Sequence, residues 1–136
     1  ALRDDVEQTM HGGLPVIFDV SLPVGAMEAY TQALPAALEA AIGEHRLFIF
    51  GHLGDGNLHV IVQVAPEAYE RLRPGVEQVV YAPLEAVGGS VSAEHGIGLE
   101  KKPWLGLSRS PAELALMRRL KETLDPRSIL NPGKIL

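Results

Sequence analysis

Two histidines flank a glycine-rich segment at residues 51–59, GHLGDGNLH. Asp-Gly is a strong signal for a two-residue hairpin turn, because both turn positions need a positive φ. We place this turn at Asp55 and Gly56. The resulting register predicts His52 directly opposite His59, with the Cβ atoms about 4.5 to 5.5 Å apart on one face. Two such imidazoles can bind one metal ion at about 2.0 to 2.1 Å each. The alternatives are two ordinary hairpin histidines, or a register one residue away that turns the rings to opposite faces.

A second small-residue segment, residues 88–98 (GGSVSAEHGIG), contains one acid and one base, Glu94 and His95. Its glycines and serines allow these side chains to approach another element or a ligand. A carboxylate from here would complete a set of two histidines and one carboxylate, which leaves open positions on zinc, manganese or iron(II). The alternative is that Glu94 caps a helix and His95 is a surface residue.

A metal ion beside His95 suggests a reaction class. The ion would polarise the O–H bond of a bound hydroxyl group and disfavour the imidazolium form, so that His95 stays available as a base. Proton abstraction from an alcohol is then a reasonable reaction. The spacing of these residues does not say where a hydride would go.

The composition narrows the class of protein. A chain of 136 residues is about one domain long, and its net charge of -5 comes without a run of one sign, which argues against a nucleic-acid or polybasic membrane surface. The absence of cysteine leaves any metal to histidine and carboxylate ligands. No apolar stretch approaches the roughly 20 residues of a bilayer span. We expect a protein in the cytoplasm or peripheral at the inner face of the membrane, and a chain that is a piece of a longer protein because it opens in a helical pattern without Met.

The periodicity of the apolar residues predicts the elements that position these groups. Strands are expected at residues 15–22, 46–52 and 57–64, with the second one central because it is apolar on both faces. Helical patterns cover residues 27–42, then 69–87 with an interruption at Pro74 and Gly75, and finally a helix that starts with a capping box at residues 110–113. This order predicts a ferredoxin-like α+β fold, an antiparallel sheet with helices on one face, followed by a C-terminal helical segment.

Three motifs, at residues 51–59, 90–98 and 130–134 (LNPGK), together resemble the C-terminal region of FAD-linked oxidases of the vanillyl-alcohol oxidase superfamily. The closest branch looks like the group of D-lactate dehydrogenase, the glycolate oxidase D-subunit and D-2-hydroxyglutarate dehydrogenase. Residues 19–23 (DVSLP) also fit, so the resemblance spans nearly the whole chain. It implies that residues 1–136 are the substrate or cap domain of such an enzyme, with the FAD-binding domain upstream.

The resemblance also implies roles for single residues. The implied ligands of a divalent metal, often zinc, are His52, His59 and Glu94. This metal would hold the carboxylate and hydroxyl groups of a D-2-hydroxyacid, while His95 contacts the substrate as the base and hydride passes from substrate C2 to the flavin of FAD. Arg3 matches an arginine that pairs with a substrate carboxylate, and its alternative is a solvated helix residue. Asn131 matches a segment that approaches the flavin, although Asn-Pro is also a common turn.

Two positions depart from the pattern of hydroxyglutarate-specific members. Those enzymes have Lys two residues before the motif Asp and Asn two residues after the second His, whereas this chain has Ile17 and Ile61. We therefore expect a drier pocket and a monocarboxylate substrate such as lactate, glycolate or an apolar analogue. The expected partners are an electron-acceptor protein or quinone, with a homodimer left open. The alternatives to a flavoenzyme cap are a metal-dependent hydrolase or lyase, and a nonenzymatic metal or ligand-binding module.

Overall fold

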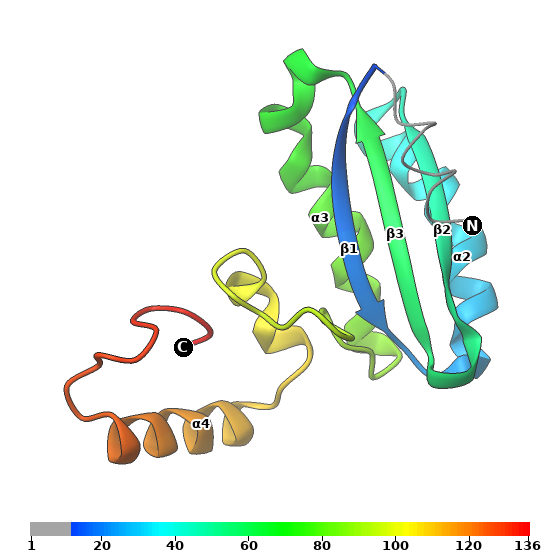
Figure 1. Ribbon diagram of the computed structural model, residues 1–136. Helices are drawn as coiled ribbons and strands as arrows, with labels where there is room; N and C mark the ends of the chain where they lie inside the picture. The colour runs from blue at the N-terminus through cyan, green and yellow to red at the C-terminus, as the bar shows by residue number, and fades with distance from the viewer. Residues whose placement is uncertain (1–11) are drawn as a thin grey trace.

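The structure is a computed structural model in which residues 12–136 are described (Figure 1). Its main elements are β1 (Leu14–Ser21), α2 (Val24–Ile42), β2 (Arg46–His52), β3 (Asn57–Val64), α3 (Tyr69–Ala86) and α4 (Pro111–Leu124). Short 3₁₀ turns lie at Leu53–Asp55, Pro66–Ala68 and Lys102–Leu107. Among the described helices, none is both long and apolar enough to cross a membrane.

The strands form one antiparallel sheet in the order β1-β3-β2. β1 and β2 are therefore parallel to each other with β3 between them, which is the split βαβ arrangement of the predicted α+β fold. The prediction that residues 46–52 form the central strand is wrong, because β2 lies at an edge and β3 is central. The apolar residues on the second face of β2 are Phe48 and Phe50, which are only partly buried.

Helices α2 and α3 cover one face of the sheet (Figure 1). Strand residues alternate between faces, and every second residue of β1 and β3 joins the buried core beneath these helices. The core residues of the strands are Val16, Phe18, Val20, Leu58, Val60, Val62 and Val64. The opposite side, which we call the open face, carries Ile17, Asp19, Phe48, Phe50, His52, Asn57, His59 and Ile61. The chemistry of the site lies on this open face.

The two helices are joined by a buried hydrogen bond. The hydroxyl group of Tyr30 in α2 donates to the carbonyl oxygen of Val80 in α3 at 2.7 Å. Burial raises the pKa of the Tyr30 phenol well above its ordinary value, so this hydroxyl group remains a donor. Helix α2 then ends where the sequence predicts, at Gly43, whose φ of 72° stops the helix.

Helix α3 is continuous, so the predicted interruption at Pro74 and Gly75 is wrong. Proline has no N–H, and Pro74 therefore removes the hydrogen bond that the carbonyl group of Glu70 would accept. Burial of apolar side chains further along α3 offsets this loss. The fully buried residues of the helix are Val76, Val80 and Leu84.

The C-terminal arm, which we define as residues 110–136, begins with the predicted capping box. The N–H of Ser110 donates to the carboxylate of Glu113 at 2.8 Å, and the Ser110 hydroxyl oxygen accepts from the N–H of Glu113. No residue of α4 is buried, and α4 lies apart from the sheet in Figure 1. The end of the arm returns toward the body of the domain, where the N–H of Ile135 donates to the carbonyl oxygen of Gly98 at 3.1 Å.

Candidate metal centre

The turn of the β2–β3 hairpin differs from the predicted one. Leu53–Asp55 form a turn of 3₁₀ helix, and Gly56 follows with a left-handed φ of 72°. A side chain does not fit there, because a Cβ on Gly56 would lie 2.4 Å from the carbonyl oxygen of Leu22. The loop is longer than two residues, since Asp55 continues the helical turn and does not adopt the positive φ that a two-residue Asp-Gly turn requires.

This longer turn moves the hairpin register by two residues. His52 lies opposite Asn57 and Phe50 lies opposite His59, so the predicted pairing of the two histidines is wrong. Because side chains alternate with a period of two, a shift of two residues keeps both histidines on the same face. They are diagonal neighbours, and their ring centroids are 6.1 Å apart.

Three potential metal ligands meet at this end of the open face. One ligand atom each from His52, His59 and Glu94 lie within 4.8 Å of one another. Ligand atoms around a tetrahedral zinc ion are about 3.4 Å apart at ordinary bond lengths, so side-chain rotation would close the set. His52 can rotate because it is exposed, whereas His59 is partly buried. Two imidazoles and a carboxylate suit a divalent metal and leave coordination positions for a substrate.

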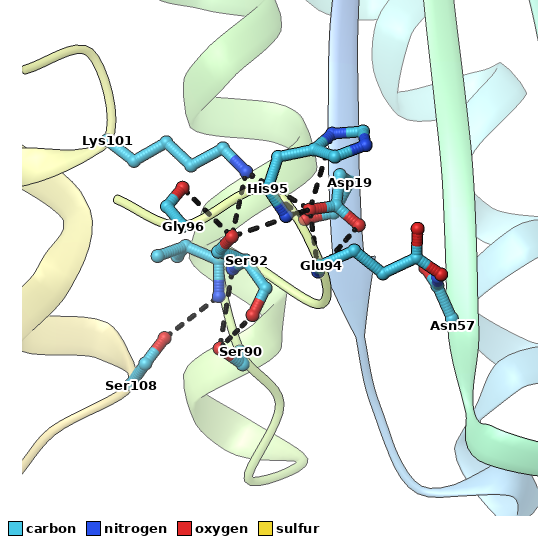
Figure 2. A network of polar contacts seen from close by, with 10 residues as sticks. Asp19, Asn57, Ser90, Ser92, Glu94, His95, Gly96, Lys101 and Ser108 are labelled. Atoms are coloured by element: carbon cyan, nitrogen blue, oxygen red, sulfur yellow. Dashed lines mark hydrogen bonds and ion pairs between the residues drawn. The ribbon is translucent and has the colours of Figure 1, made fainter. Parts of the chain in front are cut away.

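A buried amide orients the carboxylate of Glu94. Asn57 is 3% exposed, and its Nδ2 donates to Glu94 Oε1 at 2.6 Å (Figure 2). An ionised carboxylate can only accept hydrogen bonds, which fixes the end of the amide that faces it. Hydrogen bonds of this kind commonly hold metal-binding carboxylates in place. The arrangement leaves the other oxygen of Glu94 available to an ion.

The loop that carries Glu94 and His95 runs along the outer edge of β1. Ser21 and Ser90 exchange backbone hydrogen bonds of 3.0 and 2.7 Å in a short antiparallel bridge. Beyond this bridge the loop forms neither strand nor helix, so Glu94 does not cap a helix. The loop takes the position beside β1 that the fourth strand of a ferredoxin-like sheet would occupy. It thereby brings an acid and a base next to the hairpin.

A buried acid on β1 receives this loop. Asp19 lies opposite His59 in the sheet register and accepts the backbone N–H groups of Glu94 at 2.9 Å and His95 at 2.8 Å (Figure 2). The Nζ of Lys101 lies 3.5 Å from the same carboxylate. Burial alone would raise the pKa of Asp19, but the two N–H donors and the charge of Lys101 outweigh it and hold the pKa below its ordinary value. Asp19 is therefore a buried, ionised carboxylate.

His95 lies beside the three potential ligands. Its ring is roughly parallel to that of His59, with centroids 6.1 Å apart and an interplanar angle of 29°. Its Nδ1 is 3.6 Å from Asp19 Oδ2, which is longer than a hydrogen bond but orients this nitrogen toward the buried acid. His95 also borders a cavity of about 330 Å³, whose wall includes Ile17 and Ile97. The ring is thus placed between the ligand group and a cavity whose wall is apolar at these isoleucines and charged at Asp19, Glu100 and Lys101.

The remaining residues selected from the sequence are Arg3 and Asn131. Arg3 is outside the described residues. Asn131 is exposed in the C-terminal arm and has a φ of 46°. The sequence reasoning missed the roles of Asp19, Asn57 and Lys101. For Asp19 a signal existed, because an acid inside an otherwise apolar strand must find partners when it is buried.

Comparisons with known proteins identify the family of the chain. Residues 1–135 match the family model described as FAD linked oxidases, C-terminal domain. The chain is 36% identical to the D-2-hydroxyglutarate dehydrogenase of Stutzerimonas stutzeri (strain A1501), over 98% of the chain and 30% of that protein. It is 40% identical to the D-2-hydroxyglutarate dehydrogenase of Xanthomonas citri pv. viticola, over 98% of the chain and 29% of that protein. The mitochondrial D-2-hydroxyglutarate dehydrogenase of Bos taurus is 41% identical, over 100% of the chain and 25% of that protein. The chain therefore spans less than a third of the length of these relatives.

Proposed function

The chain belongs to the family of C-terminal domains of FAD linked oxidases, and from this membership we propose that it is the substrate-binding part of a flavoenzyme that oxidises a D-2-hydroxyacid to the 2-oxoacid. The observation that carries the proposal is the gathering of His52, His59 and Glu94 within 4.8 Å. His95 lies beside this group. It follows Glu94 on the same loop and provides a basic side chain. This is the arrangement expected for binding and deprotonating a hydroxyacid.

In this proposal each side chain has a separate task. When bound, a divalent metal at His52, His59 and Glu94, with zinc as the expected ion, would polarise the substrate hydroxyl group, and the flavin would accept the C2 hydride. His95 removes the hydroxyl proton through Nε2, because Nδ1 faces the carboxylate of Asp19. Loss of this proton and of the C2 hydride converts the alcohol into the carbonyl group of the 2-oxoacid.

Two isoleucines on the open face near His95 support the choice of substrate class. Ile17 is 58% exposed and lies on the wall of the cavity beside His95, and Ile61 is the partner of Ile17 in the sheet register. An isoleucine pair offers no donor to a second carboxylate, which would lose its hydration without compensation. We therefore propose a monocarboxylate, such as lactate, glycolate or an apolar analogue, although the relatives named above are D-2-hydroxyglutarate dehydrogenases.

FAD would be bound mainly by an upstream domain, since the matched family is the C-terminal domain of FAD linked oxidases. The C-terminal arm is suited to contact that domain. Several of its apolar residues are exposed, namely Leu116, Leu120, Leu124, Ile129 and Leu130. Asn131 lies in the same arm and, in this proposal, approaches the flavin from there. The 136-residue chain alone would then bind metal without turning over substrate.

Further partners of the whole protein are part of the same proposal. Arg3 would pair with the substrate carboxylate, and the electrons would leave the flavin for an acceptor protein or a quinone. A homodimer and a location in the cytoplasm or at the inner face of the membrane stay predictions from the sequence. The relative from Bos taurus is named as mitochondrial.

The test is flavin reduction in the full-length protein, with metal analysis on the same sample. D-2-hydroxyacids with one and with two carboxylates are supplied, and bleaching of the flavin is followed. His95→Ala should lower the rate of reduction by about 10² to 10⁴-fold, because a general base is lost, while the metal content stays the same. His45→Ala is the matched control, because His45 is a partly buried histidine outside the ligand group.

The outcomes separate the alternatives. Unchanged reduction by the His95→Ala variant would remove His95 from the role of base. Hydrolysis of an ester or amide without flavin bleaching would select a metal-dependent hydrolase. Metal binding with neither reaction would leave a nonenzymatic binding module.

A further inference from the structure

The ligands of the candidate metal centre come from two kinds of backbone. His52 and His59 lie on strands whose hydrogen bonds fix their positions. Glu94 and His95 lie on a loop that is neither helix nor strand. Such a loop would have to be ordered each time an ion or substrate binds, and this ordering would weaken binding. Something in the fold must therefore hold the loop against the sheet.

We propose that Asp19 is the positioning residue that holds Glu94 and His95 for the metal and the substrate, a role that rests on the proposed metal site. Three consecutive backbone N–H groups of the loop donate to this one residue, and Figure 2 shows those of Glu94 and His95. Ala93 donates to the carbonyl oxygen of Asp19 at 3.2 Å, Glu94 to its carboxylate at 2.9 Å and His95 to the same carboxylate at 2.8 Å. The two successive N–H groups that converge on the carboxylate form an anion-binding concavity.

The placement of Asp19 makes this contact specific to the site. Asp19 is 1% exposed and lies opposite His59 in the register of β1 and β3. A single row of the sheet therefore sets the position of a hairpin histidine and, through Asp19, of the loop. Asn57 also holds the side chain of Glu94, through a hydrogen bond of 2.6 Å. Both the backbone and the carboxylate of Glu94 are therefore fixed.

Lys101 supplies the charge balance that the buried Asp19 needs. Its Nζ lies 3.5 Å from Asp19 Oδ2, 3.4 Å from the Asp19 carbonyl oxygen and 3.1 Å from the hydroxyl oxygen of Ser92. An ammonium group has three N–H donors, and these three acceptors use all of them. Lys101 is thus committed to the loop and to β1. It contacts Asp19 without touching the N–H groups of Glu94 or His95, which makes it a useful control.

The experiment uses the full-length flavoprotein and compares Asp19→Asn with Lys101→Met. Zinc affinity is measured by competition with a chelator, and the ligand geometry by the EPR spectrum of Co²⁺ in place of zinc with the flavin oxidised. We expect Asp19→Asn to lower zinc affinity by about 10 to 100-fold and to change the Co²⁺ spectrum, as is typical when a group behind a metal ligand is lost. Lys101→Met should lower zinc affinity and change the Co²⁺ spectrum less than Asp19→Asn does, because the N–H contacts to Asp19 remain although its counter-charge is lost.

The results distinguish this role from a general effect on folding. Equal losses of affinity in both variants would assign Asp19 to the buried ion pair alone and overturn the positioning role. Wild-type affinity and spectrum in Asp19→Asn would overturn it as well, with the metal site intact. A wild-type protein without zinc affinity would overturn the metal site itself. If Asp19→Asn does not fold, Asp19→Glu keeps the charge beside Lys101 but moves the carboxylate by one methylene, and an unchanged Co²⁺ spectrum there would contradict the proposal.

Discussion

Phe18 and Asp19 are neighbours in β1, and both are 1% exposed, yet they are buried on opposite faces of the sheet and in different surroundings. Phe18 faces the helices and packs edge-on against Tyr81, with ring centroids 5.1 Å apart. Asp19 faces the other side and is surrounded by N–H donors and an ammonium group. The same alternation is repeated in β3, where Val60 is fully buried under the helices and His59 points to the open face.

This difference shows how a small sheet separates stability from chemistry. The covered face excludes water and carries the apolar core, so substitutions there should change the free energy of unfolding. The open face carries polar groups whose partners come from distant parts of the chain, so substitutions there should change binding and turnover. Neighbouring residues of one strand should therefore differ in the kind of effect they produce.

The largest effect on folding is expected at Phe18. Phe18→Ala should lower the free energy of unfolding by about 3 to 5 kcal/mol, because it removes a fully buried ring and leaves a cavity. Ile17→Ala is the matched control one residue away, on the open face and 58% exposed, and should cost less than about 1 kcal/mol. Urea denaturation followed by Trp104 fluorescence measures both. Equal losses of unfolding free energy in the two variants would show that the two faces of the sheet do not differ in their contribution to stability.

The largest effect on binding is expected at the hairpin histidines. His59→Ala should reduce zinc affinity by more than about 100-fold, because loss of a direct ligand should exceed the 10 to 100-fold typical of the groups behind ligands. The free energy of unfolding of the apo-protein should change little, since His59 is only partly buried. His45→Ala should leave zinc affinity unchanged. Retained affinity in His59→Ala would mean that the three side chains do not share an ion.

Much of this division of the sheet could be predicted from the sequence. The apolar periodicity predicted all three strands to within one residue and the α+β fold. The predicted hairpin register was wrong because Asp55 forms part of a 3₁₀ turn. The conformation of this turn depends on the contact of Gly56 with Leu22 as well as on the Asp-Gly pair. Both histidines still fell on one face, because the error was two residues and the period of a strand is two.

The network of contacts that holds the loop could not be predicted from the sequence. Asp19 could be recognised as an acid in an apolar strand, but its partners Glu94, His95 and Lys101 follow 75 to 82 residues later. No local pattern pairs residues at that separation. Asn57 was hidden for a related reason, because the predicted register placed it opposite Gly54 and away from the ligands. Its contact with Glu94 depends on the path of the loop along β1.

A smaller effect is expected for the apolar part of the open face. Replacing Ile17 by Lys and Ile61 by Asn together should raise the preference for 2-hydroxyglutarate over lactate by about 10 to 100-fold, since hydrogen bonds to a charged group contribute about 1.5 to 3 kcal/mol. The measurement is the ratio of kcat/KM for the two acids in the full-length flavoprotein. Ile17→Leu with Ile61→Val is the apolar control. An unchanged ratio would place the substrate tail away from this pair.

The smallest effect is expected in the C-terminal arm. The arm carries apolar residues, as the covered face does, but they are exposed, as residues of the open face are. Leu124 is 79% exposed, so local polar contacts and not a core must order the end of α4. Asp125 provides them, because it forms an ion pair with Lys121 and accepts the N–H groups of Ile129 at 3.0 Å and Leu130 at 2.9 Å.

The contact with Lys121, followed by the N–H of Ile129, lowers the pKa of Asp125 below its ordinary value of 3.8. A folded-state pKa below the unfolded value means that the stabilisation is complete above the unfolded pKa and is lost as the pH falls through the folded one. The amide NMR signals of Ile129 and Leu130 should therefore shift together on acidification below about pH 4, while core amides such as that of Val60 stay unchanged. Asp125→Asn should abolish this titration. If Val60 shifted together with the arm, the arm and the core would unfold as one unit, and the ordering of the tail would depend on the sheet as well as on Asp125.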